Sequence, residues 1–215
     1  RADLANGLLS RYLGATRDYG GLAVLPLCLS MRGAVRAMTA ASRGASGAAE
    51  VAFAFAETAL VAPPAPRLVA IGGLSGTGKS TVARGLAPDL APLLGAVVIR
   101  SDVTRKRLGG VTPEERLPPS AYTAAMDRAV TARMAFDARR ALRAGASVVL
   151  DATFLGAEAR DCAAAVARSA GAAFDGVWLA LSAEEAARRV ANRRGDASDA
   201  SPEVVAAQAG NARPP

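Results

Sequence analysis

The chain has 215 residues, of which 51% are hydrophobic, 21% are charged and 4% are aromatic. This balance excludes a disordered polyelectrolyte and predicts a globular protein whose core consists mainly of Ala, Leu and Val. The absence of histidine excludes Ser-His triads, histidine zinc sites and imidazole general bases. A net charge of +7 favours anionic partners such as nucleotides or nucleic acid.

Few features of the sequence point to a compartment. No apolar run reaches the roughly 18 residues that a membrane span needs, because the longest, residues 21–31, is short and contains Pro26. Cys28 and Cys162 are isolated in apolar or Ala-rich surroundings, which predicts buried free thiols in a reducing cytoplasm. The sequence begins at Arg1 without a signal-peptide pattern, so we expect a cytoplasmic fragment of a longer protein.

Three helices are predicted before a proline-rich segment. Leucines at helical spacing mark residues 4–16, and further helices are expected over residues 22–41 and 48–60. Residues 62–66 read Ala-Pro-Pro-Ala-Pro, the composition of a stiff polyproline-type linker. We therefore divide the chain into a helical segment, residues 1–62, and a second domain, residues 66–215.

After the linker, predicted strands and helices alternate. Short apolar runs predict buried strands at 68–72, 96–100, 147–151 and 177–181, with helices at 79–90, 121–143, 157–169 and 183–194. Such alternation is typical of a parallel sheet with helices on both faces. The predicted fold class is therefore α/β, preceded by a helical extension.

Residues 73–80 read Gly-Leu-Ser-Gly-Thr-Gly-Lys-Ser, a full match to the phosphate-binding loop of P-loop NTPases, placed between a predicted strand and a predicted helix. Its glycines let backbone N–H groups surround a phosphate chain, and the helix N-terminus adds a positive dipole. Lys79 is expected to reach the β- and γ-phosphates of ATP, and Ser80 to hold Mg²⁺. The predicted nucleotide-binding residues are Gly73, Ser75, Gly76, Thr77, Gly78, Lys79, Ser80 and Thr81.

A candidate general base, Asp102, follows the second predicted strand, at the end of the sheet where α/β proteins bind ligands. It could accept the proton of a substrate hydroxyl that attacks the γ-phosphate, or it could equally cap a short helix. The neighbouring Arg105, Lys106 and Arg107 are expected to form a solvated helix face rather than a substrate clamp. Lys79 and Lys106 are the only lysines among 26 basic residues, so a compact ammonium is expected to matter at both positions.

A second acid, Asp151, ends the third predicted strand. An acid in this place commonly binds Mg²⁺ directly or through water in nucleotide-binding proteins, although it could instead cap the following turn. Because the phosphate loop already implies a nearby cation, we favour Asp151 as a metal ligand together with Ser80.

The last predicted helix ends in Arg193 and Arg194, which have no acidic residue at i,i+4 spacing. By contrast, Glu184 and Glu185 are each four residues before an arginine, so helix-surface pairing explains Arg188 and Arg189. Because a polar stretch, residues 196–201, follows, Arg193 and Arg194 are expected to close over the nucleotide as a lid. The alternative is a solvated helix end whose cations favour the dipole.

Residues 67–210 resemble the P-loop kinases that include gluconate kinase-like, zeta-toxin-like and 5′-polynucleotide kinase-like domains, often described as AAA-domain ATP-binding proteins. The segments that carry the resemblance are 73–81, 100–102, 149–154 and 193–200. The resemblance implies a nucleoside-kinase-like sheet, ATP and Mg²⁺ as cofactors, Asp102 as the substrate-facing acid and Arg193 as a lid residue. Kinases of this kind have a fifth strand near the adenine, which this sequence lacks, so we expect the domain to be truncated.

Residues 3–43 resemble the helical C-terminal end of an aminoglycoside phosphotransferase-like domain, above all at Asp18-Tyr19 and in residues 25–32. Domains of that kind precede P-loop kinases in some bacterial proteins. The catalytic segments of that family are absent, so the resemblance assigns no phosphotransferase activity to residues 1–62.

The sequence as a whole predicts an ATP-dependent phosphotransferase that uses Mg²⁺ and acts on a hydroxyl-bearing substrate. One alternative is a regulatory ATPase or nucleotide switch, in which water is the acceptor. Another is a nucleic-acid-binding or 5′-hydroxyl polynucleotide kinase module, which the +7 charge supports and the scarcity of aromatic residues opposes.

Overall fold

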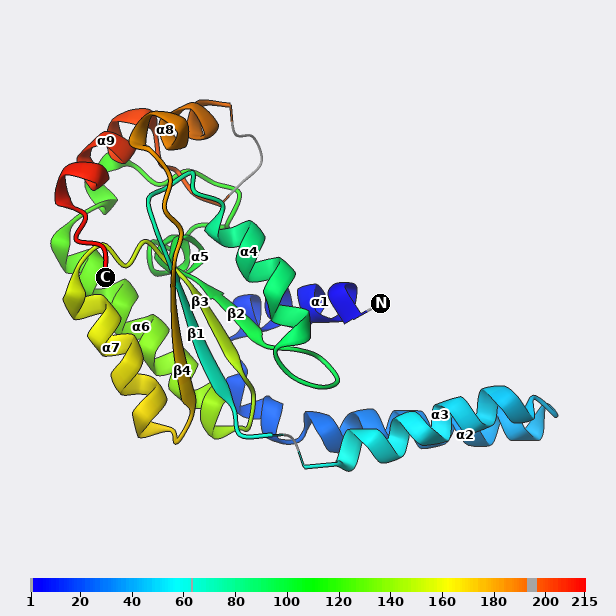
Figure 1. Ribbon diagram of the computed structural model, residues 1–215. Helices are drawn as coiled ribbons and strands as arrows, with labels where there is room; N and C mark the ends of the chain where they lie inside the picture. Colours follow the sequence, from blue (N-terminus) through cyan, green and yellow to red (C-terminus); the bar gives the residue numbers. More distant parts are fainter. Residues whose placement is uncertain (1, 63, 193–196) are drawn as a thin grey trace.

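A computed structural model describes residues 2–62, 64–192 and 197–215 of the chain. Its centre is a parallel sheet in the order β2-β3-β1-β4, formed by β1 (Arg67–Gly72), β2 (Val97–Arg100), β3 (Val148–Asp151) and β4 (Ala173–Trp178) (Figure 1). The predicted α/β class and parallel sheet are confirmed. The pairing of β1 with β3 places Asp151 opposite Ile71, one residue from the end of β1 and the start of the phosphate loop.

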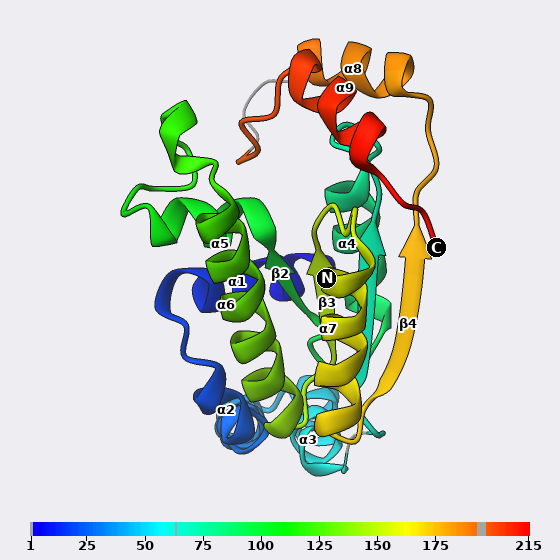
Figure 2. The ribbon, with the colours of Figure 1, turned by 90° about the vertical axis from the view of Figure 1, so that its left-hand side faces the viewer.

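Helices cover both faces of the sheet, as Figure 2 shows. On one face, α6 (Ala124–Arg143) and α7 (Ala157–Ser169) pack against alternate strand residues such as Leu68, Val148 and Leu150. On the other face, α4 (Lys79–Leu86) packs against Val69, Ile71 and Val149. Because neighbouring strand residues point to opposite faces, both sides of the central strands are buried, which accounts for their short, continuous apolar runs.

The first helix, α1 (Ala2–Thr16), covers the free edge of β2. The Asn6 side-chain amide donates to the Leu94 and Ala96 carbonyls at 2.6 and 2.8 Å, and the Ser10 hydroxyl accepts from the Val98 N–H at 3.2 Å. An edge strand exposes unpaired backbone groups, so these polar side chains of α1 complete the sheet. The helix is thus packed against the sheet domain.

The next two helices, α2 (Leu25–Ser42) and α3 (Ser46–Leu60), form a hairpin that projects from the body (Figure 1). The two helices pack closely because Gly33 faces Ala56: a Cβ on residue 33 would lie only 2.9 Å from the Ala56 Cβ.

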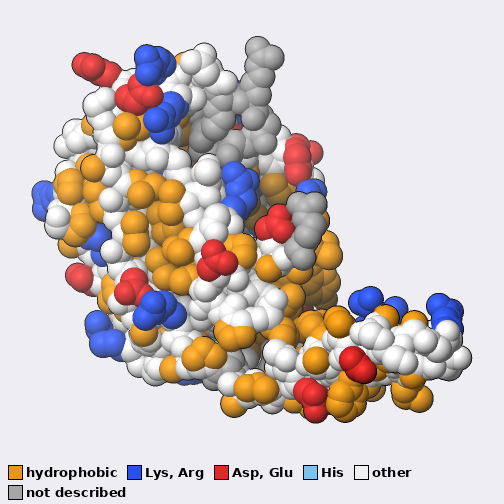
Figure 3. Space-filling model, turned by 45° about the vertical axis from the view of Figure 1, so that its right-hand side comes forward, with side chains coloured by type: hydrophobic (Ala, Val, Ile, Leu, Met, Phe, Trp, Pro, Cys, Tyr) orange, Lys and Arg blue, Asp and Glu red, His pale blue; other side chains and the backbone are white. Residues whose placement is uncertain are grey.

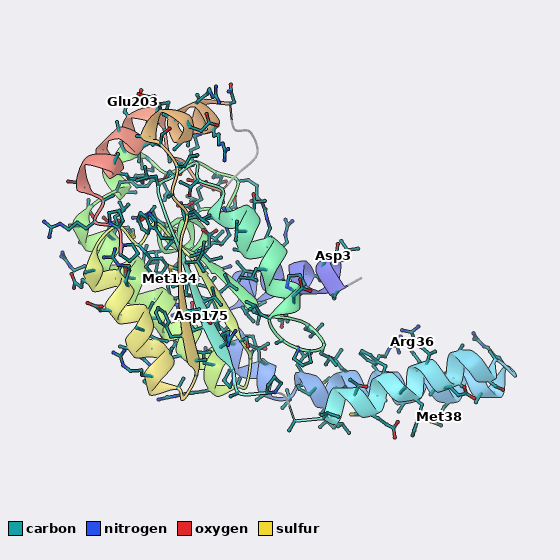
Figure 4. All side chains as sticks on the ribbon, viewed as in Figure 1. Asp3, Arg36, Met38, Met134, Asp175 and Glu203 are labelled. Atoms are coloured by element: carbon teal, nitrogen blue, oxygen red, sulfur yellow. The ribbon has the colours of Figure 1, made fainter. Side chains whose placement is uncertain are left out.

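The hairpin exposes apolar side chains that the body buries. Figure 4 labels two methionines that illustrate this: Met38 on the hairpin is 73% exposed, whereas Met134 on α6 is 5% exposed within the body. Apolar side chains are exposed along the hairpin (Figure 3), as at Met31, Val51 and Phe53. The proposed domain boundary after residue 62 stays a prediction.

The remaining elements are short or lie near the ends of the strands. They are the 3₁₀ turns η1 (Tyr19–Ala23), η2 (Ala87–Asp89) and η3 (Pro119–Ala121) and the helices α5 (Ser101–Leu108), α8 (Ala183–Ala191) and α9 (Pro202–Asn211). No helix within the described ranges is both long enough and apolar enough to cross a membrane.

Two expectations about local structure are wrong, and one helix was missed. The fourth strand was expected to be buried at 177–181, but β4 begins at Ala173 and is largely exposed, because it is an edge strand that pairs with β1 alone. Helix α9 was not predicted. Cys28 is exposed and Cys162 half-buried, both as free thiols, because Cys28 lies on the projecting hairpin.

Candidate functional site

The phosphate loop connects the end of β1 to the start of α4, as the sequence predicts. Gly78 precedes α4 at φ 92°, in the left-handed region that favours glycine, and the Lys79 ammonium donates to the Leu74 carbonyl at 2.7 Å. Gly76 lies against α8 so closely that a Cβ would clash with the Ala186 carbonyl oxygen. The loop is therefore wrapped tightly, with backbone conformations that require glycine at these points.

A cavity of 980 Å³ opens over this loop. Among the predicted nucleotide-binding residues, its walls include Ser75, Gly76, Gly78, Lys79, Ser80 and Thr81. Gly73 and Thr77 do not line it: the Gly73 N–H donates to the Thr153 carbonyl at 3.0 Å, and the Thr77 hydroxyl donates to the Leu74 carbonyl at 2.9 Å. These two residues hold the shape of the loop, and the other six present it to the cavity.

Asp151 lies beside the loop. The Ser80 hydroxyl donates to Asp151 Oδ2 at 2.5 Å, and Arg100 donates through Nε to the same oxygen at 3.1 Å and through Nη2 to the Ser80 hydroxyl at 3.1 Å. Arg100 and Asp151 are paired residues of β2 and β3, so the sheet register brings their side chains together. Asp151 is 4% exposed and has charged or polar partners rather than a cap role.

The donor set at Asp151 and Ser80 fits Mg²⁺. Magnesium prefers oxygen ligands and keeps several waters, binding proteins through one or two carboxylates plus substrate phosphates. One carboxylate and one hydroxyl meet here, and the described part of the chain contains no cluster of three or more His, Cys, Asp or Glu side chains for a metal held by protein alone. The Arg100 guanidinium donates to both of these oxygens, so a positive charge already lies beside them.

Asp102 lies in the first turn of α5 and lines the same cavity as Lys79 and Ser80. Arg100 is the N-cap residue of that helix, and no side chain caps it, so Asp102 is free of the cap role that the sequence left open. Burial raises the pKa of the Asp102 carboxyl, opposed by the positive charge of Arg100 and reinforced by the charge of Asp151. A hydrogen bond with the Ser198 side chain acts in the opposite direction to burial.

Facing the phosphate loop is a wall held together by Asp199. Its carboxylate accepts from Lys106 Nζ at 3.1 Å, the Tyr122 hydroxyl at 2.8 Å and the Leu117 N–H at 3.1 Å. Burial alone would raise the pKa of Asp199, but these hydrogen bonds outweigh it and the pKa is lowered. Asp199 thereby links α5 to the segment that follows α8.

The expectation that residues 105–107 form a solvated helix face is wrong for Lys106, which is 2% exposed. Its ammonium also donates to the Pro113 carbonyl at 3.0 Å, so both of its partners lie outside α5. Arg105 is mostly buried too, with an ion pair to Asp127 at 2.7 Å and its guanidinium 5.1 Å from the Tyr122 ring centroid. The segments that cover α5 arrive from distant parts of the chain, and this explains the error.

Helices α8 and α9 pack on the phosphate loop. Leu74 of the loop is buried with Ala186, Val190 and Val205 of these helices. From α9, the Gln208 side-chain oxygen accepts a hydrogen bond from the Ser75 N–H at 2.8 Å. The Ser75 N–H, one of the backbone donors of the loop, is therefore already hydrogen-bonded to an oxygen of the protein.

The predicted arginine lid is only partly described by the structure. Arg193 and Arg194 lie outside the described residues. On α8, Glu185 pairs with both Arg188 and Arg189, so the expected pair of Glu184 with Arg188 is replaced by an i,i+3 contact from Glu185. Arg189 also lines the cavity over the loop.

Sequence reasoning missed several residues at this site. Arg100, Ser198, Asp199 and Gln208 reach it only because the fold brings together segments up to 133 residues apart. The rarity of lysine was a usable signal for Lys106, since a buried ammonium with two fixed oxygen partners differs from an exposed arginine.

Solved structures with a similar fold include an unliganded sugar kinase from Janibacter sp. HTCC2649, at 22% identity and a TM-score of 0.51, covering 69% of this chain and 79% of that one. A gluconokinase from Sinorhizobium meliloti 1021 matches at 22% identity and a TM-score of 0.44, covering 70% of this chain and 77% of that one. At this level of identity, the likeness to the sugar kinase is one of fold alone.

Curated relatives include the uncharacterized proteins Rv2004c of Mycobacterium tuberculosis H37Rv and Mb2027c of Mycobacterium bovis, each 34% identical over 163 residues. The match covers 72% of this chain and 32% of each relative, so the chain spans about a third of the length of these proteins. A family model, AAA_33, described as an AAA domain, matches residues 68–215, from the first strand through the phosphate loop and both walls of the cavity. On that match, the chain belongs to the AAA domain family and has the fold of a P-loop kinase.

Proposed function

We propose that the protein is an ATP-dependent kinase that transfers the γ-phosphate of ATP to a hydroxyl group of a small substrate. The observation that carries this proposal is the position of Asp102, which borders the same cavity as Lys79 and Ser80 without capping its helix. A carboxylate beside the phosphate loop supports the role of a general base for an acceptor hydroxyl, as in other phosphoryl transfers.

In the proposed reaction, the backbone N–H groups of Gly76, Gly78, Lys79 and Ser80 and the Lys79 ammonium hold the phosphates of ATP. The acceptor oxygen forms a bond to the γ-phosphorus as the bond from that phosphorus to the β,γ-bridging oxygen breaks and ADP leaves. The hydroxyl proton passes to the Asp102 carboxylate, whose raised pKa makes it a better proton acceptor than an ordinary aspartate. Ser80 and Asp151 would hold Mg²⁺, which neutralises charge on the phosphates when bound.

Three finer predictions belong to the same proposal. Arg193 and Arg194 are proposed to contact the nucleotide as lid residues. Residues 66–215 are proposed as the kinase domain, and residues 1–62 as the helical end of an aminoglycoside phosphotransferase-like domain. A cytoplasmic location also stays a prediction.

The test is transfer of label from γ-³²P-ATP in the presence of Mg²⁺ to a panel of acceptors: neutral sugars, sugar acids, nucleosides, and an oligonucleotide with a free 5′-hydroxyl. We expect a labelled small-molecule product that the Lys79→Ala variant fails to make. Release of free phosphate without any labelled product would contradict the kinase and favour the ATPase. Label on the oligonucleotide alone would favour the polynucleotide kinase alternative.

A further inference from the structure

A second cavity, of 890 Å³, lies on the other side of α5 from Asp102. Thr104 and Arg107 of α5 line it together with parts of α1, β2 and α6, whereas Asp102 lines only the cavity over the phosphate loop. Residues two and five positions along a helix from Asp102 point to different sides from it, so α5 separates the two cavities. They meet near Arg84 and Arg116, which line both.

Seven arginines line this second cavity, and we refer to three of them that lie near one another, Arg17, Arg107 and Arg133, as the arginine cluster. Asp137, which is 3% exposed, accepts from Arg133 through both carboxylate oxygens, at 3.0 and 2.6 Å. Within the residues that the structure describes, neither Arg17 nor Arg107 has an acidic partner within 4.0 Å. The three guanidinium groups of the cluster and the Asp137 carboxylate together carry a net charge of +2, and the further lining residues include four more arginines and two more acids, Glu114 and Asp199.

The cluster is costly for the protein in the absence of an anion. Burial, together with the positive charge of Arg17, lowers the pKa of the Arg107 guanidinium. Two half-buried guanidinium groups repel each other unless an anion lies between them. Arg17 and Arg107 are not packed into the core, because both side chains line a cavity.

The backbone at Arg17 has an uncommon conformation for a residue other than glycine. Arg17 follows the last residue of α1 and has φ 58°, a left-handed conformation that helix ends usually give to glycine. The Arg17 carbonyl is fixed by the Arg140 guanidinium at 3.4 Å. From this position at the end of α1, Arg17 lines the cavity.

A neutral donor completes the surroundings of the cluster. Burial, then the charge of Asp137, raises the pKa of Tyr19 to about 12, so its hydroxyl stays protonated at neutral pH. Tyr19 lines the same cavity and is 3% exposed. The cavity thus offers two kinds of hydrogen-bond donor, the charged guanidinium groups and the uncharged Tyr19 hydroxyl. Among its described lining residues, the buried Tyr19 ring is the one aromatic surface on which a nucleic-acid base could stack.

We propose that the arginine cluster binds the phosphate group of a small phosphorylated molecule, at a site separate from the phosphate loop. A phosphate monoester carries close to two negative charges at neutral pH and three acceptor oxygens, which match the net charge and the forked donors of the cluster. The cavity volume is in the range of small-molecule sites. The proposal does not depend on the kinase activity, since none of these arginines contacts the loop.

The test is isothermal titration calorimetry with two probes, inorganic phosphate and glycerol 3-phosphate, at constant ionic strength. All proteins carry Lys79→Ala, which weakens phosphate binding at the loop. The variant Arg17→Gln/Arg107→Gln removes the unbalanced charges, and Arg36→Gln/Arg128→Gln removes two exposed arginines that line neither cavity. Arg107→Lys keeps the positive charge but lacks the paired N–H donors of a guanidinium group. This single variant replaces the double variant in the test if the double variant does not fold.

We expect one phosphate site per chain, with a dissociation constant raised at least tenfold by Arg17→Gln/Arg107→Gln, raised at least threefold by Arg107→Lys and unchanged by the control. If glycerol 3-phosphate binds more tightly than inorganic phosphate, the natural ligand is a phosphorylated metabolite. If the two probes bind equally, the ligand is free phosphate. The same dissociation constant in the cluster variants and the control would overturn the proposal. So would binding of a short oligonucleotide that is tighter than either probe and lost in the cluster variants.

Discussion

The two sides of the cleft are built in different ways. The phosphate loop is a run of consecutive residues, 73–80, that contains all the glycines, the lysine and the serine of the motif. The facing wall is assembled from α5, the loop before α6 and the segment after α8, tied together by Asp199. The phosphate loop is therefore local in sequence, whereas the facing wall depends on tertiary structure.

This difference teaches which changes should affect binding and which should affect folding. A substitution in the loop should remove contacts to a ligand and only short-range contacts within the scaffold, such as the bond from Lys79 to the Leu74 carbonyl. A substitution in the wall removes a contact between distant segments. The predictions below use that contrast, from the largest expected effect to the smallest.

Lys106→Met should destabilise the fold by about 3–5 kcal/mol, because it leaves the Asp199 carboxylate buried without its cation. The free energy of unfolding in urea measures this. Arg128→Met, an exposed change on α6, is the matched control and should stay within about 0.5 kcal/mol of wild type. Equal stability of the two variants would show that the wall does not depend on this ion pair.

Lys79→Ala should weaken binding of a non-hydrolysable ATP analogue roughly 100-fold, since a hydrogen bond to a charged phosphate contributes about 1.5–3 kcal/mol. Its stability without nucleotide should match wild type, in contrast to Lys106→Met. Fluorescence titration and thermal melting together make the comparison. A variant that binds the analogue normally would remove Lys79 from the proposed site.

Gln208→Ala and Gln208→Glu should change nucleotide affinity in opposite directions. Without the Gln208 oxygen, the Ser75 N–H is free for a phosphate, so we expect affinity to rise by up to about fivefold, or about 1 kcal/mol. A glutamate keeps the acceptor but adds negative charge beside the phosphates, so affinity should fall. Calorimetric titration with the ATP analogue measures both, and a change of the same sign in both variants would contradict a direct contact role.

The stability of the fold should depend on pH in opposite ways at the two aspartates of the wall. The Asp199 pKa is lower in the folded state than in the unfolded state. The ionised carboxylate therefore stabilises the fold at any pH above its unfolded-state pKa, and this stabilisation is lost as the pH falls through its folded-state pKa. The Asp102 pKa is raised, so the folded state binds more protons than the unfolded state between the two values, and stability falls as pH rises through that window. Asp102→Asn should therefore be slightly more stable than wild type at neutral pH, whereas Asp199→Asn should be less stable. The free energy of unfolding in denaturant, measured from pH 4 to 8, tests both. A less stable Asp102→Asn or a more stable Asp199→Asn would contradict the prediction.

How much the sequence could predict follows the same division. The motif placed Lys79, Ser80 and the loop glycines because their spacing alone defines the structure, and apolar runs located β1, β2 and β3, which are mostly buried. The edge strand β4 was misplaced because exposed residues such as Asp175 interrupt its pattern. Asp199 and Gln208 could not be recognised, because their partners Lys106 and Ser75 are 93 and 133 residues away and no local pattern links them.

The central claim is that Asp102 accepts the proton of the acceptor hydroxyl, and the direct test is the rate of labelled phosphate transfer by Asp102→Asn to an acceptor found with the wild-type protein. The substitution keeps the size of the side chain but removes its ability to take a proton. We expect transfer to fall by roughly 10²–10⁴, the usual contribution of a general base, while affinity for the ATP analogue stays at the wild-type value. Transfer at the wild-type rate would contradict the account.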